Sequence, residues 1–245
     1  MAYTFSKRGL VKSERFSFPG LPCLYLGASS YVCWVELNRP PYDTVQVAYI
    51  VPEEATRELF FGDISLLPSR FVELMKKHKS PYSVDEYASI FPLIAMCSVK
   101  VNNNLDYFKP EYVFPQFLME YVLEMGKSKG IIGLKYASVK MTSKYQYEKD
   151  DWELYTCYVV PSISTYDIES GTDTCFDLFR IENSISAVEQ EFLSYGIASE
   201  RAGKIEEARL LCENKFIYTE SDMAVSYDST RFFEIDFFLK IKDMK

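Results

Sequence analysis

The chain is short of the residues on which many hydrolytic and metal sites depend. Among its 245 residues there is one histidine, His78, and it lies in the basic run at residues 76–79. A Ser-His-Asp triad needs a histidine as its base, and zinc is normally held by histidines or paired cysteines. The composition therefore argues against a triad and against a metal site. It leaves carboxylates, arginine, tyrosine and serine to carry any chemistry.

The cysteines also lack a metal-binding or redox pattern. None of the six belongs to a Cys-x-x-Cys pair, and most lie in apolar stretches. Free cysteine behaves as a small hydrophobic residue. We therefore expect buried, reduced thiols at Cys23, Cys33, Cys97, Cys157, Cys175 and Cys212.

Long apolar runs are absent as well. The chain has no window of about twenty apolar residues, the length that spans a bilayer. Its start, MAYTFSKR, lacks the apolar core of a signal peptide, so the expected location is the cytoplasm. The net charge of −8 argues against non-specific nucleic-acid binding, which needs clustered lysine and arginine. The negative net charge is compatible with binding of a small anionic ligand, because two arginines close to the ligand can outweigh the overall charge.

The first two thirds of the chain show patterns of both helices and strands. Ser29 or Ser30 is expected to cap a helix ending near Leu37, and Ser83 with Glu86 forms a capping box at the start of another. The helix over residues 113–127 is expected to bury one apolar face, formed by Phe117, Leu118, Tyr121, Val122 and Met125. A further helix is predicted over 68–77, and strands over 21–27, 44–51, 93–101, 131–137 and 154–160.

The character of the sequence changes beyond Pro161. Helices are predicted over 184–195 and 199–213, and strands over 174–181, 215–219 and 231–241. We expect an α+β fold in two parts: a domain at residues 1–164 with a mixed sheet and flanking helices, and a C-terminal α/β extension at 165–245 docked on it.

The segment from Arg15 to Glu36 carries the candidate site residues. Arg15 is either a surface residue or a guanidinium that binds phosphate oxygens, with Arg8 as a second cation nearby in sequence. Tyr25, inside a predicted strand, is either a core residue or an aromatic surface for a heterocycle or ribose. Glu36 is near a predicted helix C-terminus, where its charge opposes the helix dipole. It is either a solvated surface residue or a carboxylate placed for chemistry. Ser138 ends a predicted strand, a common place for a ligand contact and equally for an ordinary serine.

Two blocks of this sequence resemble the RES-domain family, named for an arginine, a glutamate and a serine. The first is Arg-Phe-Ser-Phe-Pro-Gly-Leu-Pro at residues 15–22, then Leu-Tyr-Leu at 24–26 and Trp-Val-Glu at 34–36. The second is Lys-Pro-Glu-Tyr-Val-Phe-Pro-Gln at 109–116, followed by Gly-Ile-Ile-Gly-Leu-Lys-Tyr-Ala-Ser at 130–138. The resemblance covers roughly residues 8 to 161, and leaves open whether Ser138 or the nearby Ser143 supplies the serine.

The resemblance implies a fold similar to ADP-ribosyltransferase toxins. It implies a toxin of a bacterial toxin–antitoxin module that degrades NAD+ by hydrolysis or phosphorolysis, with no cofactor and with a cognate antitoxin as partner. Glu36 would stabilise the ribosyl cation, Arg15 and Arg8 would hold the pyrophosphate, Tyr25 would orient the nicotinamide ribose, and Ser138 would contact the nicotinamide end or position Glu36. Two alternatives stay open: an ADP-ribosyltransferase acting on a macromolecule, and a non-catalytic nucleotide-binding module.

Overall fold

The computed structural model describes residues 5–54, 59–103, 106–140, 152–162 and 178–186, together with Phe232, Ile235, Asp236 and Leu239. The chain divides into two compact units. Unit 1 comprises Met1–Leu26, Pro52–Val139 and Thr156–Phe179, and unit 2 comprises Gly27–Val51, Lys140–Tyr155 and Arg180–Lys245.

Unit 1 is built on a four-stranded mixed sheet with the strand order β1-β5-β4-β3. β4 runs parallel to β3 and antiparallel to β5, so that Leu134 faces Gly62 on one side and Val159 on the other. Gly133 is required in this sheet because a Cβ atom there would lie 2.2 Å from the carbonyl oxygen of Val159. The strands are β1 (Cys23–Gly27), β3 (Phe60–Ile64), β4 (Ile131–Ala137) and β5 (Thr156–Pro161).

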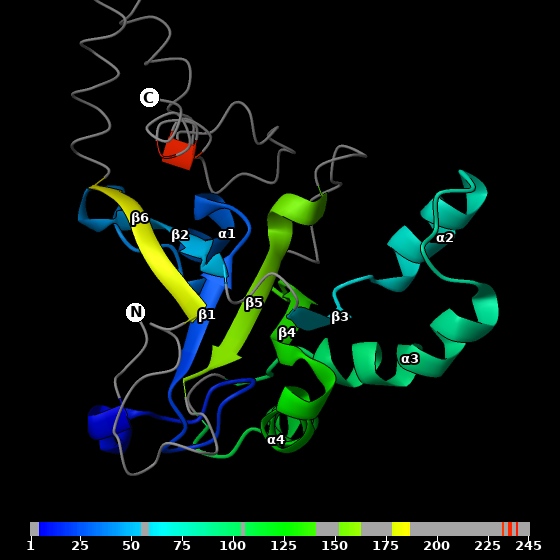
Figure 1. Ribbon diagram of the computed structural model, residues 1–245, viewed down its shortest axis with the longest axis horizontal. Coiled ribbons are helices and arrows are strands. Elements are labelled where there is room, and N and C mark those ends of the chain that lie inside the picture. The colour runs from blue at the N-terminus through cyan, green and yellow to red at the C-terminus, as the bar shows by residue number, and fades with distance from the viewer. Residues whose placement is uncertain are drawn as a thin grey trace, which may run out of the picture. The chain divides into compact units, whose positions relative to one another are not determined.

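Three helices lie in the chain between the parallel strands β3 and β4, as a parallel connection requires. They are α2 (Pro68–Lys76), α3 (Val84–Cys97) and α4 (Val113–Lys129). α4 packs on β4, and α3 packs on α4 and on β3 (Figure 1). Phe71 of α2 stacks on Tyr87 of α3 with ring centroids 3.8 Å apart, and the Tyr87 hydroxyl donates a 2.9 Å hydrogen bond to the Leu66 carbonyl.

The strand predicted over residues 93–101 is wrong, because α3 continues through Pro92 to Cys97. Its buried residues are Tyr87, Ile94 and Cys97, whose spacing places them on one helical face. A short apolar run does not distinguish a buried strand from a buried helix. The capping box predicted at the start of α3 is confirmed: Ser83 Oγ accepts from the Glu86 amide, and the Glu86 carboxylate accepts from the Ser83 amide.

The apolar face predicted for α4 is wrong in three of its five residues, since Val122 is buried and Leu118 partly buried. The residues that α4 buries are Pro115, Met119, Val122 and Gly126. By contrast Phe117, Tyr121 and Met125 are exposed, as is Phe114. A helix with apolar residues on most sides does not reveal from its sequence which side meets the sheet. Gly126 explains the choice, because a Cβ atom there would lie 2.4 Å from the Ile131 carbonyl oxygen, so this face approaches the start of β4 closely.

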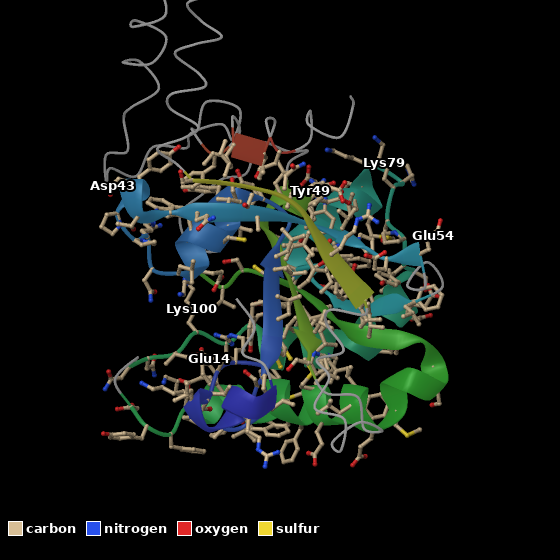
Figure 2. All side chains as sticks on the ribbon, turned by 60° about the vertical axis from the view of Figure 1, so that its left-hand side comes forward. Glu14, Asp43, Tyr49, Glu54, Lys79 and Lys100 are labelled. Carbon is tan, nitrogen blue, oxygen red and sulfur yellow. The ribbon has the colours of Figure 1, made fainter. Side chains whose placement is uncertain are left out.

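Unit 2 contains α1 (Ser30–Glu36) and a two-stranded sheet of β2 (Gln46–Pro52) and β6 (Phe179–Ser186). Tyr49 of β2 is labelled in Figure 2. The core of the unit is formed by Ile185, Phe232, Ile235 and Leu239, with partly buried aromatic rings packed against it: Tyr31, Trp34, Tyr42 and Tyr49. The strand predicted over 231–241 is wrong where the structure describes this segment. The four residues described there, Phe232, Ile235, Asp236 and Leu239, are helical, and buried Phe232, Ile235 and Leu239 follow helical spacing.

The α+β class with a mixed sheet is confirmed. The predicted cap and end of α1 are confirmed too, since Ser29 is the N-cap and Leu37 the C-cap. Of the strand predicted over 174–181, residues 179–181 are confirmed as the start of β6, whereas Leu178 is helical. β6 continues to Ser186, so the helix predicted over 184–195 is wrong at residues 184–186. Most of the predicted extension at 165–245 is outside the described residues, and that division of the chain stays a prediction.

Candidate functional site

The predicted site residues are distributed over both units. Unit 1 holds Arg8, Arg15, Tyr25 and Ser138, and unit 2 holds Glu36. Arg8 is exposed on the short 3₁₀ helix Phe5–Leu10. Ser138 directly follows β4 and is 1 % exposed. Ser143, the alternative serine, is outside the described residues.

Arg15 is at the tip of a tight hairpin formed by residues 14–17, called here the Arg15 hairpin. The amide of Glu14 donates to the Ser17 carbonyl at 2.8 Å and the amide of Ser17 donates to the Glu14 carbonyl at 3.3 Å. Between them, Phe16 is 0 % exposed and packs on Tyr136 of β4, with ring centroids 4.6 Å apart. The hairpin is therefore held by a buried ring next to the residue that carries the charge. Figure 2 labels Glu14, the residue before Arg15.

The guanidinium of Arg15 contacts the end of α3. Its Nη1 donates to the carbonyl of Cys97 at 3.1 Å and to that of Val99 at 2.8 Å, and its Cζ lies 5.4 Å from the centre of the Tyr112 ring. A cation is favourable there because the last carbonyls of a helix carry partial negative charge. These contacts give Arg15 a structural role and fix its orientation. A guanidinium has five N–H donors, so Nη2 and Nε supply donors beyond the two bonds that Nη1 makes.

Tyr25 is joined to the same hairpin through its hydroxyl. The Tyr25 hydroxyl and Ser17 Oγ are 2.9 Å apart, and Ser17 is 1 % exposed. Tyr25 itself is 37 % exposed, so its hydroxyl end points inward while other parts of the residue reach solvent. Burial raises the pKa of the Tyr25 hydroxyl above its ordinary value, and the hydrogen bond to Ser17 offsets part of that effect. The hydroxyl is therefore protonated at neutral pH and acts as a hydrogen-bonding group.

Gln116 joins the second sequence block to the first. Its Nε2 donates to Ser13 Oγ and to the Glu14 carbonyl, both at 2.9 Å, and to the Ser17 carbonyl at 3.3 Å. Together with the contact between Phe16 and Tyr136, these bonds connect the blocks that the sequence places about a hundred residues apart. The structure thus brings Arg15, Tyr25 and the strand that leads to Ser138 together within unit 1.

Glu36 is the last residue of α1, whose position in unit 2 is fixed by several hydrogen bonds. The amide of Ser30, at the first turn, donates to both carboxylate oxygens of Asp236, at 3.2 and 3.1 Å. Ser29 Oγ donates to the Leu154 carbonyl at 2.6 Å. A carboxylate is favourable at a helix N-terminus. At the other end of α1, Lys140 Nζ donates to the Glu36 carbonyl and lies 3.9 Å from Glu36 Oε2.

Sequence reasoning missed two of these partners. Lys140 compensates the unfavourable placement of Glu36 at a helix C-terminus, and nothing in the sequence pairs the two residues. Gln116 belonged to the second block, but its contact with the Arg15 hairpin was not foreseen. In both cases the acceptors include backbone carbonyls. Because every residue has such a carbonyl, the sequence does not show which one is bonded.

The predicted burial of the cysteines is confirmed at three of the four that the structure describes. Cys23, Cys97 and Cys157 are buried free thiols, and Cys33 is a partly buried one. Burial raises the pKa of Cys33 and of Cys97 to about 11. Cys175 and Cys212 are outside the described residues.

The described residues contain neither a cluster of metal ligands nor a helix suited to a membrane. They include no group of three or more histidine, cysteine, aspartate or glutamate residues arranged to hold a metal ion. Within the same part of the chain, none of the helices has the length and apolar character that crossing a membrane requires.

Comparison with known proteins gives a partial match to a toxin-like protein. "Putative toxin YopC" of Bacillus subtilis (strain 168) is 36 % identical to the chain over 163 residues. The match covers 64 % of this chain and 36 % of that protein, so the chain spans about a third of the relative's length. No family model matches the chain, and no solved structure matches it.

Proposed function

We propose that the protein is a toxin that cleaves the bond between nicotinamide and ribose in NAD+, by hydrolysis or phosphorolysis. The observation that carries this proposal is the hydrogen-bonded arrangement of the Arg15 hairpin with Tyr25 and Gln116, which unites the two blocks that resemble the RES-domain family. The name of the Bacillus subtilis relative supports the toxin part of the proposal. The NAD+ part rests on the resemblance and on the chemistry of the residues.

The reaction suits a site without histidine or metal. Breaking the nicotinamide–ribose bond builds positive charge on the ribose, and a carboxylate can stabilise that charge, as in glycoside cleavage. Glu36 is the candidate for this role. Nicotinamide departs as a neutral molecule because its ring is already cationic in NAD+, so a strong general acid is unnecessary.

The remaining residues have binding roles in this proposal. Arg15 would bind the pyrophosphate through the nitrogens other than Nη1, with Arg8 as a second cation. Tyr25 would pack on nicotinamide or its ribose and orient the bond to be broken. Ser138 would hydrogen-bond the nicotinamide end or help to position Glu36. A cognate antitoxin protein is the partner that a toxin of this kind requires.

The test is NAD+ turnover by the purified protein, followed by chromatography of the products. We expect loss of NAD+ with release of one nicotinamide for each NAD+ consumed. Free ADP-ribose in phosphate-free buffer would indicate hydrolysis, and a phosphorylated ADP-ribose formed only with inorganic phosphate would indicate phosphorolysis. ADP-ribose attached to protein would favour the transferase alternative. No release of nicotinamide under any of these conditions would overturn the proposal.

A further inference from the structure

The Arg15 hairpin contains two backbone carbonyls that each accept two hydrogen bonds. Its two carbonyl acceptors, on Glu14 and Ser17, each accept one bond across the hairpin and a second one from Gln116. Gln116 is therefore bonded to both strands of the hairpin at once, on either side of Arg15. The third acceptor is Ser13 Oγ, just before the hairpin.

The orientation of the Gln116 amide follows from these partners. An amide nitrogen has two hydrogens to donate, whereas its oxygen only accepts. The carbonyls of Glu14 and Ser17 can only accept, so the nitrogen must face them. Two hydrogens serve three acceptors, and the 3.3 Å contact to Ser17 is the longest of the three. No other uncharged side chain of similar length supplies two donors from one atom.

The geometry points to Gln116 as a positioning residue for Arg15. It fixes both strands of the hairpin to α4 and so holds the guanidinium in place for an anionic ligand. The inference rests on the proposed function for the identity of that ligand, the pyrophosphate of NAD+. Gln116 itself acts through the hairpin and is assigned no contact with the substrate.

The hairpin has a second support that makes the inference testable. Phe16 is fully buried against Tyr136, and Ser17 is bonded to Tyr25. These contacts do not involve Gln116, so its removal should loosen the hairpin without unfolding unit 1. The expected effect is local, at Arg15.

The first experiment measures the hairpin directly and does not need NAD+ turnover. Gln116→Met keeps the length of the side chain and removes both donors, and Gln46→Met makes the same change at an exposed residue of β2. Trypsin cleaves after arginine, so mass spectrometry can follow cleavage between Arg15 and Phe16. We expect Gln116→Met to raise the rate of this cleavage at least about fivefold, because a hairpin that opens more often is exposed to the protease more often. Gln46→Met should match the wild type, and equal rates in all three proteins would overturn the inference.

The second experiment measures KM and kcat for NAD+ in the same three proteins. Loss of a uniform binding contact raises KM and leaves kcat nearly unchanged, so Gln116→Met should raise KM at least about tenfold with kcat within about threefold. A merely structural role would reduce the amount of active protein, lowering kcat with KM unchanged, and that result would overturn the inference. If the wild type consumes no NAD+, the proposed function fails, while cleavage after Arg15 still decides whether Gln116 holds the hairpin.

Discussion

The side chain of Lys140 holds the end of α1 at Glu36. Its Nζ lies 3.9 Å from Glu36 Oε2 and donates to the Glu36 carbonyl and, at 2.9 Å, to Asn38 Oδ1. The chain turns sharply here, since Asn38 and Arg39 have φ angles of 64° and 53°, a left-handed conformation that is unfavourable without glycine. One lysine thus supports a strained turn and lies beside the carboxylate that precedes it.

Replacing Lys140 should therefore affect activity more than stability. Both side chains are partly exposed, and exposed ion pairs contribute little to folding. We expect Lys140→Met to lower kcat for NAD+ cleavage about tenfold through misplacement of Glu36, with a small change in the melting temperature. Lys140→Arg, which keeps the charge and the donors, should retain most of the activity. Lys79→Met is the matched control at an exposed lysine, labelled in Figure 2, and an equal loss in both methionine variants would contradict the prediction.

Glu36→Gln is the most direct test of the proposed chemistry. The change keeps the shape of the side chain and removes the negative charge that would stabilise the ribosyl cation. We expect kcat to fall at least about a hundredfold, the scale of loss when one electrostatic stabiliser is removed from an active site. Circular dichroism should be unchanged, because the Lys140 bond to the Glu36 carbonyl does not depend on the carboxylate. The control is Glu120→Gln, the same change at an exposed residue of α4. Undiminished turnover in Glu36→Gln would show that Glu36 has no catalytic role.

Tyr25→Phe separates the contribution of the hydroxyl to stability from the contribution of the ring to activity. The buried Ser17 hydroxyl would lose its 2.9 Å partner, so we expect the free energy of unfolding to fall by about 1–2 kcal/mol in urea titrations. If the ring orients the substrate, NAD+ turnover should stay within about threefold of the wild type, whereas Tyr25→Ala should lose at least about tenfold. Tyr107→Phe, at a fully exposed tyrosine, should change neither quantity. Equal turnover in Tyr25→Phe and Tyr25→Ala would show that the ring has no orienting role.

Local signals in the sequence were sufficient for much of the fold. The cap at Ser29 and the capping box at Ser83 each depend on a side chain bonding a backbone amide a few residues away, and both were predicted correctly. The errors occurred where distant contacts decide. The segment 93–97 is helical because Ile94 and Cys97 share a buried face with Tyr87. Near the C-terminus, Phe232, Ile235 and Leu239 are helical and form part of the core of unit 2. Apolar character alone does not show whether either segment is a helix or a strand.

The candidate site followed the same division. The two sequence blocks contain residues that contact one another in unit 1, namely Gln116 with Ser17, and Phe16 with Tyr136. That these blocks form a site stays a prediction. The supporting bonds were not visible. Arg15 donates to the carbonyls of Cys97 and Val99, and Lys140 donates to that of Glu36, so the identity of the accepting residue is irrelevant to the bond. Only the path of the backbone determines such pairs.

The Cys97 thiol should make the stability of the protein fall at high pH. Burial raises its pKa from 9.0 to about 11, with nearby Arg15 offsetting part of the effect. The unfolded chain therefore loses this proton first as pH rises, so the stabilisation is complete below pH 9 and is lost between pH 9 and 11. In urea titrations, the difference in unfolding free energy between the wild type and Cys97→Ala should fall by about 2 kcal/mol from pH 8 to pH 10.5. Lysines and tyrosines titrate in both proteins and cancel in this difference. A difference that is constant with pH would mean that the Cys97 thiol ionises equally easily in the folded and unfolded chain.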